Sequence, residues 1–145
     1  MAAVLDNSRV QRVLRRYEKK YDNSIAVLLS SKKGLKPQAA FDLMEVSPLI
    51  FSQIESILQV SLKTLRNYKQ HDQHLSAAMS EKVLSILALY KKGVSIFGSI
   101  GDFNKWMAAP AYGLGMQRPT ELLDTMTGIL LIGEELTRIE YGDLS

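Results

Sequence analysis

The chain has 145 residues, 46% of them hydrophobic and 23% charged, with a net charge of +3, which suits one compact domain or two very small ones. The absence of cysteine excludes disulfide frameworks, thiolate metal sites and cysteine nucleophiles, and it fits a reducing cytoplasm. Apolar runs reach only about five or six residues against about 20 for a membrane-spanning helix, and no secretory signal pattern is present, so we expect a cytoplasmic protein that does not span a membrane.

The charge is unevenly spread along the chain. Residues 1–36 contain nine lysines and arginines against three acidic residues, whereas residues 98–145 contain three against seven. Such asymmetry suggests that the N-terminal end meets a polyanion. The alternative is that these basic residues only form solvated helix faces.

The N-terminal third is predicted to be mostly helical. Residues 8–21 have apolar side chains at helical spacing, with arginines and lysines on the opposite face. Residues 25–29 could be a strand or the start of another helix, and residues 30–36 are expected to form a polar linker. Pro37 sits where a first helical residue is favoured, so a short helix is expected to follow it and to close before Pro48.

The next stretch predicts two short helices joined by a turn of about three residues. The first helix has an apolar stripe made of Phe51, Ile54, Ile57 and Leu58. Ser61 is a suitable N-cap for a second helix over residues 62–70, which carries basic residues. This arrangement is typical of a helix-turn-helix, although two such helices also occur as plain core.

The second of these helices is the candidate DNA-binding element. If Leu62 and Leu65 face inward, its polar residues face out, where a helix can enter the major groove. Lysine and arginine suit guanine, and asparagine and glutamine suit adenine. The expected DNA-binding residues are Lys63, Thr64, Arg66, Asn67 and Gln70. Two positions depart from the commonest pattern, since Gln59 replaces the usual turn glycine, at a cost on the order of 1 kcal/mol, and Glu55 replaces a small residue.

The rest of the chain is also expected to be helical. A long amphipathic helix is predicted over residues 79–97 and is ended by glycines. Three short helices are expected beyond it, over residues 103–108 with Asp102 as N-cap, 120–126 and 128–138. Because no segment alternates like a strand, we expect an all-α fold.

Signals of catalysis are poor. His71 and His74 are three residues apart in a polar segment, but no acidic cluster completes a metal site. No glycine-rich phosphate loop follows a strand, and two histidines in one loop give no basis for a nucleophilic triad. We therefore expect no enzymatic activity, no catalytic residue, no cofactor and no bound metal.

The run from Phe103 to Gly142 carries the most specific pattern. It contains an aromatic-x-x-Trp helix, the stretch Leu-Gly-Met-Gln-Arg-Pro-Thr-Glu-Leu-Leu-Asp-Thr and the ending Leu-Thr-Arg-Ile-Glu-Tyr-Gly. This run closely resembles the C-terminal toxin-binding domain of the Xre/MbcA/ParS antitoxin family, and residues 37–97 resemble that family's helix-turn-helix part. Two loop residues depart from the pattern, Met116 where a second glycine is usual and Arg118 where threonine usually precedes the proline.

The resemblance implies an antitoxin of a type II toxin–antitoxin system, encoded beside a RES-domain toxin that consumes NAD. The C-terminal segment would block the toxin's active-site cleft, and the helix-turn-helix would bind operator DNA and repress the shared operon. The toxin-binding residues carried over are Arg138, Ile139, Glu140, Tyr141, Gly142, Asp143, Leu144 and Ser145. A supporting platform is expected from Trp106, Pro119, Leu122, Leu123 and Asp124. An arginine, a rigid aromatic and an apolar side chain together also form a typical binding hot spot.

We therefore expect three parts, a basic segment over 1–36, an Xre-like helix-turn-helix domain over 37–97 and a toxin-binding domain over 98–145. The protein would act as a homodimer within a larger toxin–antitoxin complex, since one recognition helix reads few bases. The basic segment could dimerise, bind phosphates or contact the toxin. The alternative function is a free-standing helix-turn-helix transcriptional regulator whose C-terminal part senses a ligand in a closed apolar pocket.

Overall fold

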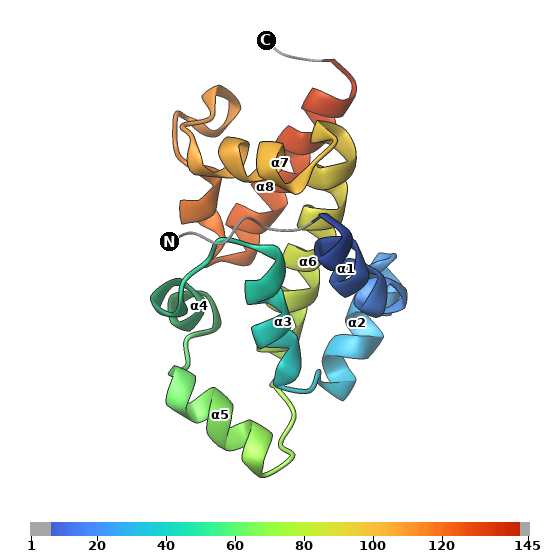
Figure 1. The fold of residues 1–145 in the computed structure, drawn as a ribbon, viewed down its shortest axis with the longest axis vertical. Helices are drawn as coiled ribbons and strands as arrows, with labels where there is room; N and C mark the ends of the chain where they lie inside the picture. Colours follow the sequence, from blue (N-terminus) through green and yellow to red (C-terminus); the bar gives the residue numbers. More distant parts are fainter. Residues whose placement is uncertain (1–6, 143–145) are drawn as a thin grey trace.

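The computed structural model describes residues 7–142, which are mostly helical, so the prediction of an all-α fold is confirmed (Figure 1). The α-helices are α1 (Asn7–Tyr21), α2 (Ser24–Lys33), α3 (Gln38–Val46), α4 (Phe51–Leu58), α5 (Leu62–Gln70), α6 (Ala77–Phe97), α7 (Ile100–Ala108) and α8 (Met126–Glu140). Two short 3₁₀ helices, η1 (Tyr112–Leu114) and η2 (Pro119–Leu122), lie between α7 and α8. In this described part, no single helix is long and apolar enough to cross a membrane, and only the bent pair α6 and α7, which turns by 110°, meets the length and composition together.

The longest helix, α6, runs through the middle of the molecule and provides its main packing surface (Figure 1). Helices α1, α2, α3, α4, α7 and α8 all contact it. The most deeply buried side chains of α6, each at most 1% exposed, include Val83, Leu84, Ile86, Leu87 and Tyr90. Burying one side chain of this size contributes about 1.5–3 kcal/mol. One continuous hydrophobic cluster therefore extends from Val10 to Leu136.

Residues 25–29, for which the sequence allows either a strand or a helix, belong to helix α2. Asn23 caps this helix, because its side-chain oxygen accepts a hydrogen bond from the amide of Ala26 at 2.9 Å. The helix continues to Lys33, so the polar linker expected over residues 30–36 is wrong in its first half. Lysines are favourable near the C-terminus of a helix, so the polar composition does not end it. Gly34 ends it with a φ of 87°, which favours glycine.

The caps in the last third of the chain differ from those expected. Helix α7 begins at Ile100 because Ser99, and not Asp102, is its N-cap, with Ser99 Oγ accepting a hydrogen bond from the amide of Asp102 at 3.1 Å. The helix expected over residues 120–126 is only the 3₁₀ turn η2. Helix α8 then begins at Met126, because the side chain of Thr125 caps its first turn at 3.0 Å.

Gly93 allows α7 to pack closely against α6. A Cβ atom at this position would lie 2.2 Å from the ring of Phe103. That ring also packs edge-on against Tyr90, with centroids 5.0 Å apart, and stacks with Trp106 at 6.1 Å. The chain's one tryptophan therefore belongs to an aromatic cluster that joins the two helices.

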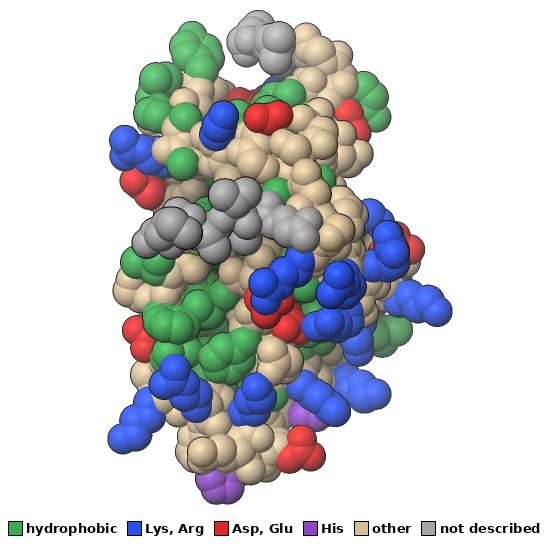
Figure 2. All heavy atoms as spheres, in the orientation of Figure 1, with side chains coloured by type: hydrophobic (Ala, Val, Ile, Leu, Met, Phe, Trp, Pro, Cys, Tyr) green, Lys and Arg blue, Asp and Glu red, His purple; other side chains and the backbone are tan. Residues whose placement is uncertain are grey.

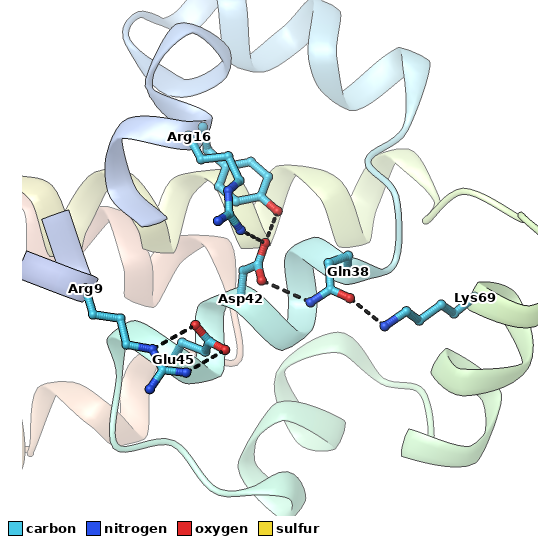
Figure 3. Close-up of polar contacts among 7 residues, drawn as sticks. Arg9, Arg16, Gln38, Asp42, Glu45 and Lys69 are labelled. Atoms are coloured by element: carbon cyan, nitrogen blue, oxygen red, sulfur yellow. Dashed lines mark hydrogen bonds and ion pairs between the residues drawn. The ribbon is translucent and has the colours of Figure 1, made fainter. Parts of the chain in front are cut away.

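Asp42 connects α1, α3 and α5 through a chain of polar contacts (Figure 3). This aspartate is 3% exposed, and its Oδ2 accepts hydrogen bonds from the Tyr17 hydroxyl and, at 3.0 Å, from Arg16 Nη1. Its Oδ1 accepts one from Gln38 Nε2 at 3.0 Å, and Gln38 Oε1 accepts one from Lys69 Nζ at 2.5 Å. Burial, together with the bond to Asp42, raises the pKa of Tyr17, so its phenol remains a protonated donor.

Replacing Asp42 with alanine is expected to lower the free energy of unfolding by about 2–3 kcal/mol, because the buried Tyr17 hydroxyl loses its acceptor. Urea unfolding measures the change. The control is Glu45→Ala, which removes only the exposed pair with Arg9 and should cost less than about 1 kcal/mol. Equal losses for the two variants would contradict a structural role for Asp42.

Candidate functional site

Helices α4 and α5 are joined by a turn with the geometry expected of a helix-turn-helix. Gln59 adopts the left-handed conformation, with φ 57° and ψ 41°, and its Nε2 donates a hydrogen bond to the carbonyl of Ser56 at 2.6 Å. Ser61 is the N-cap of α5, since its Oγ accepts a hydrogen bond from the amide of Thr64 at 3.0 Å. The turn therefore keeps the backbone that glycine usually adopts, although glutamine occupies it.

Glu55, the second departure from the usual motif, stabilises the same turn. Its Oε2 accepts a hydrogen bond from the backbone amide of Leu62 at 2.7 Å. The amides in the first turn of a helix have no partner within the helix, and negative charge is favourable there. Glu55 thus holds the start of α5 against α4. Sequence reasoning missed this contact, because seven residues separate the partners and no capping pattern has that spacing.

The prediction that the apolar stripe of α4 is buried is wrong for one of its four residues. Ile54, Ile57 and Leu58 are at most 3% exposed, but Phe51 is 50% exposed. Phe51 is the first residue of α4 and lies one turn before the buried part of the stripe. The same end of the helix also exposes Ile50, so an apolar patch borders the helix-turn-helix.

The five residues predicted to bind DNA lie together on the outer face of α5. Leu65 is fully buried and anchors the helix, and Leu62 packs against the core. On the opposite side, four residues are exposed, Thr64 is half-buried, and all five line one shallow hollow. Among the described residues, neither Lys63 nor Arg66 has an ion-pair partner. Their DNA contacts stay a prediction.

Lys69 connects α5 to α3, a role that the sequence did not indicate. Besides its hydrogen bond to Gln38, its ammonium lies over the ring of Phe41, 5.4 Å from the ring centroid. Both partners belong to α3. The orientation of α5 therefore depends on α3 as well as on α4.

Of the predicted toxin-binding residues, those from Arg138 to Gly142 lie at the C-terminal end of α8 or directly after it, where the helix projects beyond the core (Figure 1). Tyr141 is 81% exposed, Glu140 is exposed, and Ile139 is half-buried. Gly142 follows with a φ of 77°. Asp143, Leu144 and Ser145 lie outside the described residues.

Glu135 connects the end of α8 to the preceding loop. Its Oε1 accepts a hydrogen bond from Arg138 Nε at 2.7 Å, and its side chain is only 12% exposed. Its carboxylate also lies against Gly113, where a Cβ atom would be 1.6 Å from Oε2. Glu135 thus positions both Arg138 and the loop. An acidic residue three positions before an arginine on a helix could have indicated this pair.

The loop between α7 and α8 turns tightly despite its departure from the family pattern. Ala111 and Gln117 pair in an antiparallel bridge, and η1 lies between them. Gly115 and Met116 both have positive φ, 66° and 64°. Met116 therefore keeps the backbone of the glycine usual at its position, and its side chain is exposed. Arg118 forms a surface pair with Glu121 at 3.5 Å.

The expected platform is partly buried and is tied to the helix-turn-helix by Lys82. Leu123 is fully buried and Pro119 is buried, whereas Asp124 is exposed. Lys82 Nζ donates hydrogen bonds to the carbonyl of Asp124 at 2.7 Å and to the carbonyl of Ile57 at 2.8 Å. One ammonium from α6 thus joins the end of α4 to the segment before α8.

An open groove of about 900 Å³ runs between α2, α6 and α8. Its walls include Val27, Leu28, Leu89 and Leu130, with Lys92 and Glu134 also lining it. Leu28 and Leu130 are 49% and 62% exposed. This groove is open to solvent, unlike the closed pocket that a ligand-sensing regulator predicts.

Replacing Gln59 with glycine is expected to raise the free energy of unfolding by up to about 1 kcal/mol, because glycine adopts the left-handed conformation without strain. The control is Ser56→Gly, an exposed helical position in α4, which should lower it by about 0.5–1 kcal/mol. Thermal and urea unfolding measure both. A loss at Gln59 as large as that at Ser56 would show that the turn is not strained.

Replacing Gly113 with alanine is expected to displace Glu135 and to lower the free energy of unfolding by about 1–3 kcal/mol. Gly101→Ala is the matched control, since a Cβ atom there would meet only Ser99 Oγ within 4 Å, at 3.9 Å, and alanine favours a helix by up to about 1 kcal/mol. The two variants should shift the urea midpoint in opposite directions. A shift in the same direction would contradict the close packing of the loop on Glu135.

Comparison with known proteins assigns the C-terminal part of this architecture. Residues 92–142 match the family described as the antitoxin Xre/MbcA/ParS C-terminal toxin-binding domain. The match begins in the last turn and a half of α6 and includes α7, the loop and α8. Over 86 residues the chain is 33% identical to the "Antitoxin Xre" of Yersinia enterocolitica serotype O:8 / biotype 1B, a match that covers 57% of this chain and 57% of that protein. The order of these C-terminal elements and this likeness place residues 92–142 among the toxin-binding domains of the Xre/MbcA/ParS antitoxin family.

Proposed function

We propose that this protein neutralises a RES-domain toxin that consumes NAD, by occluding the toxin's active-site cleft with the end of α8. The proposal rests above all on Tyr141, which is 81% exposed at the projecting end of a toxin-binding domain. An aromatic residue costs little conformational entropy when it is held at an interface and is frequent among binding hot spots. Arg138 adds a charge-assisted donor, and Glu135 orients it beforehand.

The proposed neutralisation is steric and needs no chemistry from this chain. The acidic residues of the C-terminal part suit a toxin cleft that accepts a phosphate-bearing substrate. The residues proposed to enter the cleft are those from Arg138 to Ser145.

We also propose that the same protein represses its operon through α5, in which Lys63, Thr64, Arg66, Asn67 and Gln70 contact operator DNA. The support is their common exposed face and the preformed turn before it. A homodimer would present two such helices to two half-sites. The toxin complex would then hold several antitoxin chains together. The basic segment 1–36, the helix-turn-helix part 37–97 and the toxin-binding part 98–145 divide this work.

The proposed neutralisation is tested by measuring cellular NAD after the neighbouring toxin gene has been induced. NAD should fall with the toxin alone, stay normal with the full chain, and fall again with a chain that ends at Thr137. Tyr141→Ala should lose at least about tenfold in toxin affinity, since hot-spot truncation costs about 2 kcal/mol. Phe51→Ala, an exposed aromatic on α4, is the matched control and should keep full protection.

Two outcomes would contradict this proposal. A full-length chain that gives no protection excludes this toxin as the partner. Full protection by the chain that ends at Thr137 excludes the end of α8 as the inhibitory element. Urea unfolding of each variant shows whether a loss of protection is only a loss of folded protein.

A further inference from the structure

A belt of lysines and arginines crosses one face of the molecule from α5 to α1 and α2. Figure 2 shows these basic side chains gathered over the lower half of this face, whereas few lie over α7 and α8. We define the basic belt by five exposed residues, Arg12, Arg15 and Lys19 on α1 with Lys63 and Arg66 on α5. The operator contacts proposed above use only its α5 part.

The α1 part of the belt carries charge that the protein itself does not neutralise. Among the described residues, Arg12 and Lys19 have no ion-pair partner. The acid of α1 itself, Glu18, pairs with Lys91 of α6, and this contact lowers the pKa of Glu18. A row of unpaired cations on one helix is costly by mutual repulsion unless an anion binds there.

The orientation of α1 brings this row to the side of α5. Arg12, Arg16 and Lys19 are spaced by four and three residues, so they share one helix face. Arg16 reaches Asp42 of α3, and the same chain of contacts continues to Lys69 of α5 (Figure 3). The two basic helices are therefore fixed relative to each other through buried Asp42.

We propose that α1 is a second DNA-contacting helix, whose Arg12, Arg15 and Lys19 bind phosphates of the duplex beside the groove that α5 enters. This rests on the proposed DNA binding by α5. Phosphate contacts are independent of sequence, set the register of a recognition helix and release counterions. Duplex DNA is the polyanion that fits, because the belt is continuous with the face of α5 that carries groove-reading side chains.

The test measures the salt dependence of DNA binding by the full-length chain, using fluorescence anisotropy from 50 to 300 mM KCl. The probes are a 40-base-pair duplex from upstream of its own gene and a 40-base-pair duplex of random sequence. Arg12→Gln with Lys19→Gln should lower the slope of log K against log salt by about 1.8, at about 0.9 per phosphate, and weaken binding to both duplexes at least about tenfold. Lys105→Gln with Arg118→Gln removes the same charge from the C-terminal part and should leave the slope unchanged.

A third variant separates this inference from the operator proposal. Lys63→Gln with Arg66→Gln should abolish the preference for the upstream duplex over the random one. If that preference is lost but the α1 variant keeps the wild-type slope, the operator proposal stands and α1 is not a DNA-contacting helix. If the preference survives, α5 does not read the operator, whatever α1 does.

Other outcomes overturn the assignment to duplex DNA. Wild-type protein that binds neither duplex excludes both proposals about DNA, while the NAD experiment still tests neutralisation. Binding to single-stranded RNA or to vesicles of anionic lipid that is tighter than to the duplexes, with the same dependence on Arg12 and Lys19, assigns the belt to another polyanion. Both side chains are exposed and have no ion-pair partner among the described residues, so the urea midpoint of the α1 variant should not fall below that of the wild type.

Discussion

Burial of α6 is the constraint on which the rest of the structure depends. This 21-residue helix contacts six other helices and buries nine of its residues, and its small residue Gly93 admits the ring of Phe103. Of the helices packed on α6, α1 carries part of the basic belt, α4 is the first helix of the helix-turn-helix, and α7 and α8 belong to the toxin-binding domain. Lys82 and Lys92 extend from α6 to carbonyls of neighbouring segments, so the helix also supplies the polar contacts that orient both surfaces.

Polar groups buried inside the molecule fix the relative orientation of its surfaces. Asp42 joins α1 to α5, and Glu135 joins the loop to the end of α8. Asp42 accepts hydrogen bonds from Arg16, Tyr17 and Gln38, and its removal would leave the buried Tyr17 hydroxyl unsatisfied, whereas Glu135 accepts one from Arg138 and packs against Gly113. Each of the two proposed binding surfaces thus depends on one internal acid that contacts neither partner in our proposals.

The sequence predicted most helices, because their apolar residues recur at helical spacing. It also located Ser61 as a cap and the left-handed residue Gln59, since both are local signals. It missed what depends on tertiary structure, namely the capping of α5 by Glu55, the packing of Glu135 against Gly113 and the exposure of Phe51. The polarity of residues 30–33 predicts a linker, but these residues form the end of helix α2, which packs on α6. The proposed toxin-binding residues at the C-terminal end rest mainly on resemblance, because spacing alone does not distinguish a capture segment from an exposed helix end.

Because the hydrophobic cluster is continuous from α1 to α8 through α6, we expect the two proposed binding surfaces to be lost together when the protein is degraded. Cleavage within α6, or its forced unfolding by a protease, would disrupt the hydrophobic packing on which both surfaces depend. Neither surface would then remain folded. Turnover of the protein would then withdraw the proposed inhibition and the proposed repression in a single event. The amount of free toxin and the rate of new synthesis would rise together, without a separate signal for each.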